Sequence, residues 1–119
     1  MAKIAIIDDS QASIDMMTNI LQGQGHTVSA FISGATAEDT LAAIQPDMLL
    51  LDVVMPERNG YEVLRGLKRN AATKTIPVIL VSSKGEETDI RWGKRLGALD
   101  YIVKPYTPDQ VIEKLTQHL

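Results

Sequence analysis

Residues 49–56 read LLLDVVMP, and this stretch decides how the rest of the sequence is interpreted. Three consecutive leucines are typical of a short strand that is buried on both faces. Asp52 follows them directly, although a carboxylate without partners costs several kcal/mol to remove from water. We therefore look for groups elsewhere in the chain that explain a carboxylate at the end of the most apolar segment.

On either side of this stretch, apolar segments of strand length alternate with segments of helical periodicity. The sequence predicts strands at residues 4–7, 27–31, 48–51, 76–81 and 101–103, and helices at 11–23, 35–44, 60–70, 86–97 and 108–119. This alternation indicates an α/β fold with a parallel sheet covered by helices on both faces. No linker or repeat interrupts the pattern, so we expect residues 1–119 to form a single domain.

The composition is that of a soluble globular protein, with 45% apolar and 23% charged residues. A net charge of −3 gives no general reason to expect nucleic acid or an anionic membrane as a partner. The absence of cysteine excludes disulfides and thiolate metal sites. The N-terminal apolar run of four residues predicts neither a signal peptide nor a membrane span. We expect a cytoplasmic protein that acts through other proteins.

Polar side chains follow four of the five predicted strands. Asp8 and Asp9 follow the first strand, Asp52 the third, Ser82 the fourth and Lys104 the fifth. In open α/β sheets the functional site lies beyond the carboxyl ends of the strands, where the strand order reverses. We therefore expect three carboxylates, a hydroxyl and an ammonium group to meet at one edge of the sheet.

The residue types indicate phosphoryl chemistry at a magnesium site. Clustered carboxylates repel one another and need a cation, and oxygen ligands favour a hard ion such as Mg²⁺. The two histidines, His26 and His118, are expected to be surface residues. Asp52 stands alone on the central strand, so it is the preferred nucleophile toward phosphorus. Lys104 could neutralise a phosphoryl oxygen, and Ser82 could donate a hydrogen bond to another.

Four segments together resemble the receiver domain of bacterial response regulators, the CheY family. They read IIDDS (6–10), LLLDVVMPERNGYEVL (49–64), IPVILVSSK (76–84) and GALDYIVKPYTPDQV (97–111). The resemblance covers the whole chain and implies a flavodoxin-like three-layer sandwich, with a five-stranded parallel sheet in the order 2-1-3-4-5 and five helices. Residues 87–101, ETDIRWGKRLGALDY, are also similar to small stand-alone regulators of twitching motility and related chemotaxis-like systems.

The resemblance implies a phosphorylation-dependent switch of a two-component system rather than a metabolic enzyme. A histidine kinase would donate the phosphoryl group to Asp52, which makes the chain a phosphoprotein of a phosphorelay. Mg²⁺ would be bound by Asp9, Asp52 and the backbone carbonyl of Val54. Asp8 would hold a metal-bound water.

The resemblance also implies which side chains respond to phosphorylation. Ser82 and Lys104 would contact the phosphoryl group, and Tyr101 would change rotamer together with Ser82. The predicted helix 86–97 is the weakest, because Gly93 costs about 1 kcal/mol relative to alanine in a helix interior. We expect a downstream protein, or a second copy in a weak dimer of an otherwise monomeric chain, to bind beside this helix, the fifth strand and the last helix. The predicted contact residues are Ile90, Lys94, Tyr101 and Tyr106.

Two other functions fit parts of the sequence. Phosphatases of the haloacid dehalogenase type also form an aspartyl phosphate, but they place an acid/base aspartate two residues after the nucleophile. Val54 stands at that position and cannot transfer a proton. The other alternative is a receiver-like binding module that is never phosphorylated, and the intact set of acidic, hydroxyl and lysine residues argues against it.

Some of these residues also have simpler structural interpretations. Asp8, Asp9 or Ser10 could serve as the N-cap of the first helix. Asn59-Gly60 is typical of a turn, and we expect it to shape the loop after Asp52 without taking part in chemistry. Lys104-Pro105 is a candidate for a cis peptide bond that aims the lysine.

Overall fold

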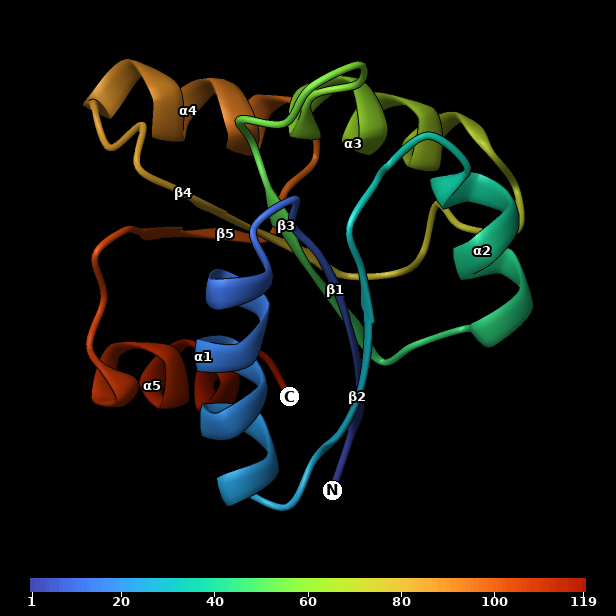
Figure 1. The fold of residues 1–119 in the computed structure, drawn as a ribbon. Coiled ribbons are helices and arrows are strands. Elements are labelled where there is room, and N and C mark those ends of the chain that lie inside the picture. The colour runs from blue at the N-terminus through green and yellow to red at the C-terminus, as the bar shows by residue number, and fades with distance from the viewer.

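The computed structural model describes the whole chain, residues 1–119, and strands alternate with helices as predicted (Figure 1). The strands are β1 (Lys3–Ile7), β2 (Thr27–Phe31), β3 (Met48–Asp52), β4 (Val78–Ser82) and β5 (Asp100–Val103). The helices are α1 (Gln11–Gly23), α2 (Ala37–Ile44), α3 (Gly60–Arg69), α4 (Glu87–Arg95) and α5 (Pro108–His118). None of these helices has the length and apolar character that crossing a membrane requires.

Eight of the ten elements differ from their predicted bounds by one or two residues at an end, and three of these differences have clear local reasons. Helix α2 begins at Ala37 rather than at residue 35, because a turn precedes it. Strand β4 begins at Val78, after Pro77, which has no N–H group for the ladder. Helix α4 ends at Arg95, and two residues later Gly97 adopts a φ of 115°. Glycine is the residue that tolerates this left-handed backbone conformation, which ends the helix.

The five strands form one parallel sheet in the order β2-β1-β3-β4-β5, which confirms the implied order. The chain runs outward from β1 to β2 and then returns to β3 on the other side of β1, so the strand order reverses between β1 and β3. Ile7 pairs with Leu51 across these two strands. The residues that follow, Asp8 and Asp52, are therefore placed side by side by the register alone.

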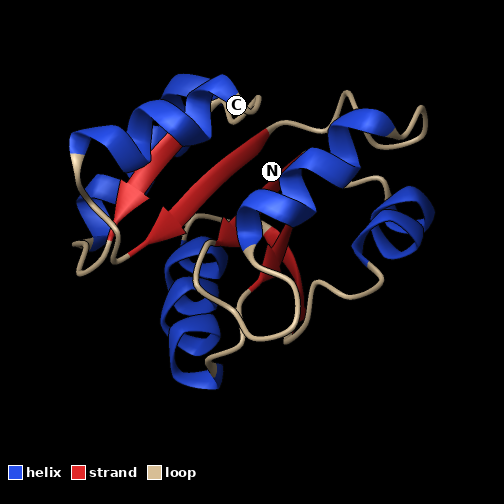
Figure 2. Ribbon diagram, turned by 90° about the horizontal axis from the view of Figure 1, so that it is seen from above, coloured by secondary structure: helices blue, strands red, loops and turns tan.

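Helices cover both faces of the sheet and form a three-layer sandwich (Figures 1 and 2). Leu49 and Leu51 pack under α2, α3 and α4, whereas Met48 and Leu50 pack under α1 and α5. This alternation follows from the two-residue period of a strand. Each of these buried side chains contributes about 1.5–3 kcal/mol of transfer free energy. The central strand is thus buried along its whole length, and Asp52 lies at its end.

Candidate functional site

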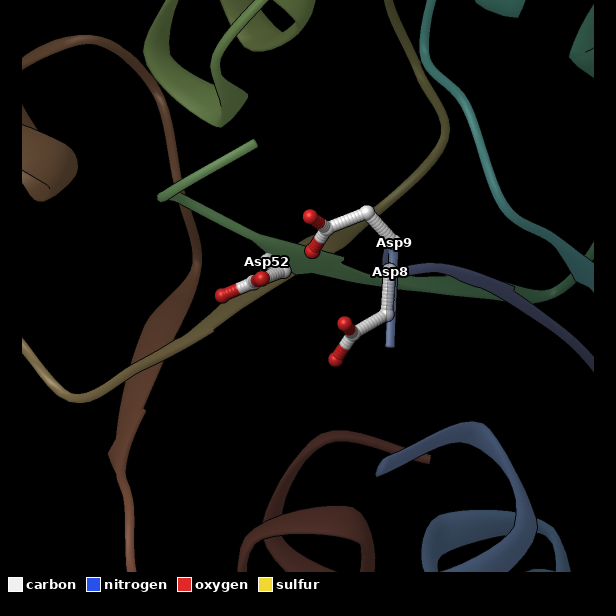
Figure 3. A group of neighbouring side chains, drawn as sticks. All are labelled: Asp8, Asp9 and Asp52. Carbon is white, nitrogen blue, oxygen red and sulfur yellow. The ribbon is translucent and has the colours of Figure 1, made fainter. Parts of the chain in front are cut away.

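Three aspartates from two adjacent strands gather at the carboxyl edge of the sheet (Figure 3). Asp8 and Asp9 follow β1, and Asp52 ends β3. One carboxylate oxygen from each residue lies within 4.8 Å of the other two. Asp8 and Asp52 are buried, at 5% and 7% exposure, whereas Asp9 is exposed. The predicted convergence of the three carboxylates is present in the structure.

Lys104 brings the only cationic side chain into direct contact with this cluster. Its Nζ lies 2.9 Å from Asp8 Oδ2 and 3.8 Å from Asp52 Oδ1, and it donates a hydrogen bond to Ser13 Oγ at 3.3 Å. The Lys104–Pro105 peptide bond is cis, as predicted. The ammonium group therefore contacts Asp8 more closely than Asp52.

The electrostatic environment of Asp52 favours its protonated form when no metal is bound. Burial, and next the negative charge of Asp8, raise the pKa of Asp52 to about 6. Lys104 and the Val53 N–H, which donates to Asp52 Oδ1 at 2.9 Å, act in the opposite direction but do not cancel this effect. One ammonium group thus does not balance three carboxylates, and a further positive charge at the site would be stabilising.

The donor set fits a hard divalent cation. The cluster consists of carboxylate oxygens only, and no sulfur or imidazole group belongs to it. Such ligands suit Mg²⁺ and do not suit zinc or copper. Val54, whose backbone carbonyl was predicted to be a further ligand, exposes 56% of its surface and keeps its side chain out of the core.

Ser82 and Tyr101 are linked through the backbone of Lys84. Ser82 is completely buried at the end of β4, and its Oγ accepts a hydrogen bond from the Lys84 N–H at 3.1 Å. The Tyr101 hydroxyl donates to the Lys84 carbonyl oxygen at 2.6 Å, and burial raises the pKa of Tyr101. Tyr101 was predicted to lie on the output face, but it is only 5% exposed. Its ring lies beneath that face, against Gly93 of α4.

The other predicted output residues differ in exposure. Ile90 is half-buried against the core under α4, and Lys94 is exposed, with its Nζ 3.9 Å from Asp100 Oδ1. Tyr106 is half-buried, and its pKa is raised by burial and then by the charge of Asp8. Tyr106 therefore lies close to the acidic cluster as well as beside the predicted face.

Ser10, rather than Asp8 or Asp9, caps the first helix. Its Oγ accepts a hydrogen bond from the Ser13 N–H at 3.2 Å. Asp8 stabilises this cap, because its Oδ1 accepts a hydrogen bond from the Ser10 N–H at 2.9 Å. The second oxygen of Asp8 remains for Lys104.

Asn59-Gly60 has a larger role than the turn that the sequence predicted. The Asn59 side chain caps α3 together with Glu62 in a reciprocal capping box. A Cβ on Gly60 would collide with the backbone carbonyl of Asp52, so glycine allows α3 to begin directly against that backbone. The spacing of asparagine and glutamate was the sequence signal that could have revealed this cap.

A third buried aspartate, Asp100, was not predicted to have partners. Its carboxylate lies 2.9 Å from His118 Nε2 and 3.1 Å from Lys114 Nζ at the start of β5. Burial alone raises the pKa of Asp100, but hydrogen bonds from His118, the Tyr101 N–H and Lys114 outweigh burial and lower it. His118 is therefore not a plain surface residue as predicted, because its ring nitrogen forms a hydrogen bond with a buried carboxylate.

The fold and the acidic cluster define a parallel α/β domain with an oxygen-ligand site at the point where its strand order reverses. Residues 4–116 match the family described as response regulator receiver domain, and the chain belongs to this family. It is 39% identical over 115 residues to the protein PilH of Pseudomonas aeruginosa. This match covers 97% of this chain and 95% of PilH.

Solved structures confirm the CheY-like, flavodoxin-like fold. Chemotaxis protein CheY4 of Vibrio cholerae superposes with a TM-score of 0.91 at 27% identity, over 100% of this chain and 99% of that chain. The BeF₃-activated DrrB receiver domain superposes with a TM-score of 0.83 at 29% identity, over 99% of this chain and 97% of that chain. Other curated relatives are longer, and this chain spans 26% to 51% of their length. Receiver domains are signalling modules rather than metabolic enzymes.

Proposed function

We propose that this protein is a phosphorylation-dependent switch of a two-component system and that Asp52 accepts the phosphoryl group from a histidine kinase. The placement of Asp52 supports this proposal. Asp52 is a buried carboxylate at the end of the central strand, with Lys104 Nζ 3.8 Å away and two further aspartates beside it. This arrangement presents a nucleophile beside one cationic group that can neutralise a phosphoryl oxygen and beside two carboxylates that can hold Mg²⁺.

The transfer step uses few groups of the protein. One oxygen of Asp52 forms a bond to phosphorus while the bond from phosphorus to the donor nitrogen breaks, and the electron pair leaves with the donor imidazole. Lys104 neutralises a phosphoryl oxygen, and Ser82 donates a hydrogen bond to another. Mg²⁺, when held by Asp9, Asp52 and the Val54 carbonyl with Asp8 bound through a water, supplies the remaining positive charge.

The same proposal includes the response of the protein. Ser82 would turn toward the phosphoryl group and give up its hydrogen bond from Lys84, and Tyr101 would follow. A downstream protein, rather than DNA, would then bind at the face formed by α4, β5 and α5. The proposal places the protein in a chemotaxis-like or twitching-motility pathway of the cytoplasm, and the structural likeness to chemotaxis protein CheY4 supports the chemotaxis-like part.

Intact mass spectrometry after incubation with Mg²⁺ and acetyl phosphate tests the proposal. The wild-type chain should gain one phosphoryl group, and Asp52→Asn, which keeps the shape but removes the nucleophile, should gain none. Asp15→Asn, which changes an exposed aspartate of α1, is the matched control and should be labelled like the wild type.

Three results would each contradict a part of the proposal. If Asp52→Asn still gains one phosphoryl group, with the label near the site labelled in the wild type, a residue other than Asp52 is the acceptor. No label on the wild-type chain would favour a binding module that is never phosphorylated. Repeated turnover of a phosphate monoester would favour a phosphatase of the haloacid dehalogenase type, although Val54 offers no proton for that reaction.

A further inference from the structure

A second polar cleft of about 570 Å³ lies between α2 and α3, and none of the acidic-site residues lines it. No hydrophobic residue lines it either, and three arginines do: Arg58, Arg65 and Arg69. This volume is in the range of clefts that hold small molecules. The polar lining does not suit an apolar ligand. The charged side chains of the cleft therefore determine which ligand it can bind.

The floor of the cleft is a fixed ion pair. Arg58 binds Glu38 at two points, with Nη1–Oε1 and Nη2–Oε2 distances of 2.6 Å each, and it also donates to the Gly34 carbonyl at 3.0 Å. The hydrogen bond from Arg58 lowers the pKa of Glu38, so this carboxylate stays ionised and occupied. A Cβ on Gly66 would collide with both side chains, so glycine lets α3 pack on the pair.

The carboxylate of the second acidic residue of the cleft, Glu62, already accepts a hydrogen bond. Glu62 Oε1 accepts a hydrogen bond from the Asn59 N–H at 3.0 Å and so caps α3. Arg65 and Arg69 take part in none of the ion pairs of the structure. They lie one turn apart on the same helix, where like charges repel each other.

The remaining donors point to an anionic ligand. Asn70 lines the cleft next to Arg69, and its Oδ1 accepts from the Ala72 N–H at 2.9 Å, which leaves its amide N–H groups as donors. Guanidinium groups match phosphate oxygens with two parallel hydrogen bonds. This local excess of positive charge occurs in a chain whose net charge is −3.

We propose that the cleft between α2 and α3 binds a small phosphate-bearing molecule through Arg65, Arg69 and Asn70. The ligand reduces the repulsion between the two arginines by neutralising their charge. It lies beside the ion pair of Arg58 and Glu38, which also lines the cleft. This inference does not depend on phosphorylation of Asp52. A small, polar phosphate ester matches the polar lining of the cleft.

Titration with inorganic pyrophosphate in Mg²⁺-free buffer, followed by amide NMR shifts, tests this proposal. Residues 58–70 should shift and saturate. The exposed double variant Arg65→Gln with Arg69→Gln should weaken binding about tenfold or more, because two charge-assisted contacts are lost. Arg91→Gln with Arg95→Gln removes two arginines of equal spacing from α4 and should leave the affinity unchanged.

Several outcomes would overturn the proposal. The α4 control could weaken binding as much as the α3 variant, which would indicate general charge attraction. Sodium sulfate at equal ionic strength could produce the same shifts with the same affinity, which would mean that phosphate is not distinguished. The shifts could also be confined to residues 8–10, 52 and 104, which would place the anion at the acidic site. Tighter binding of a polyglutamate peptide than of pyrophosphate would assign the cleft to an acidic protein segment instead.

Discussion

Asp52 carries its negative charge at a cost when no metal is bound. Burial and Asp8 raise its pKa from 3.8 to about 6, so the folded state holds a proton that the unfolded state has already released between these values. Stability from this group is therefore full below about pH 4 and is lost as the pH rises through 6. At about 1.4 kcal/mol for each pKa unit, the metal-free fold loses up to about 3 kcal/mol at pH 7.5.

Asp52→Asn should consequently stabilise the metal-free protein. We expect the free energy of unfolding at pH 7.5 in EDTA to rise by about 1–3 kcal/mol, and by less at pH 5, where the wild-type carboxyl is mostly protonated. Urea denaturation measures both values. Saturating Mg²⁺ should narrow the difference, because it stabilises the wild type preferentially. A variant that is no more stable than the wild type in EDTA would show that Asp52 is not strained by its neighbours.

Asp8 and Asp9 should contribute unequally to Mg²⁺ affinity. Both oxygens of Asp8 already accept hydrogen bonds, from Ser10 and Lys104, whereas Asp9 is exposed and forms no hydrogen bond. We expect Asp9→Asn to weaken Mg²⁺ binding about tenfold or more and Asp8→Asn to weaken it less. Calorimetric titration measures the affinity, with Asp15→Asn as the control. Equal affinity in Asp9→Asn and the wild type would exclude Asp9 as a direct ligand.

At the scale of elements, α4 is attached differently from the other helices. Gly93 is its only buried residue, whereas α3 buries Gly60, Val63, Leu64 and Leu67. A cluster of charges around Asp100 contributes to the attachment, because Lys94 of α4 and two residues of α5 surround this carboxylate of β5. The α4-β5-α5 face is therefore held by polar contacts to Asp100 in addition to apolar packing.

Asp100→Asn should destabilise the protein by about 1–3 kcal/mol at pH 7, because a buried acceptor of charge-assisted hydrogen bonds is weakened. The pKa of Asp100 in the folded state lies below 3.8, so its stabilising effect is present above that value and is lost as the pH falls through the folded pKa. Urea denaturation should therefore show a deficit at pH 7 that is still present at pH 4 and shrinks only below about pH 3.8. Glu113→Gln on the exposed side of α5 is the control. A deficit that does not change with pH would argue against a role for the charge.

The strands and the acidic cluster could be predicted because both depend on short-range sequence. The leucines of β3 and the apolar positions of α3 at Val63, Leu64 and Leu67 are all buried, as their spacing indicates. A parallel sheet then brings strand ends together, and the register of Ile7 with Leu51 places Asp8 beside Asp52.

Two charge pairs outside the acidic site could not be predicted, because no strand register fixes them. His118 lies 18 residues from Asp100, and Arg58 lies 20 residues from Glu38. Their contacts depend on how α5 and α2 pack, which periodicity does not specify. Gly93 shows a related limit: the sequence marks it as a weak point of a helix, whereas the structure shows that a Cβ there would crowd Leu80 and Tyr101.

At the scale of the whole molecule, the acidic edge and the α4-β5-α5 face are joined by a short hydrogen-bonded path. Ser82 Oγ accepts from the Lys84 N–H, and the Lys84 carbonyl accepts from the Tyr101 hydroxyl. If Ser82 turns toward a phosphoryl group, the Lys84 N–H loses its partner and the loop before α4 is released. Because Gly93 packs against the Tyr101 ring, a movement of that ring changes the surface on which α4 packs.

Addition of the phosphoryl mimic BeF₃⁻ with Mg²⁺ should therefore change amide NMR shifts over residues 82–106, including Ile90 and Lys94, beyond the shifts next to Asp52. A weakly attached helix responds because small free energies can redistribute its conformations. Ser82→Ala still offers the acidic cluster to the mimic but cannot give up the hydrogen bond from Lys84, so the shifts near residues 8, 9 and 52 should persist while those on α4 shrink. Asp52→Asn should abolish both sets. Large changes clustered in residues 11–45, with residues 86–106 silent, would place the output face on α1 and α2. Such a result would exclude Tyr101 as the link between the acidic site and α4.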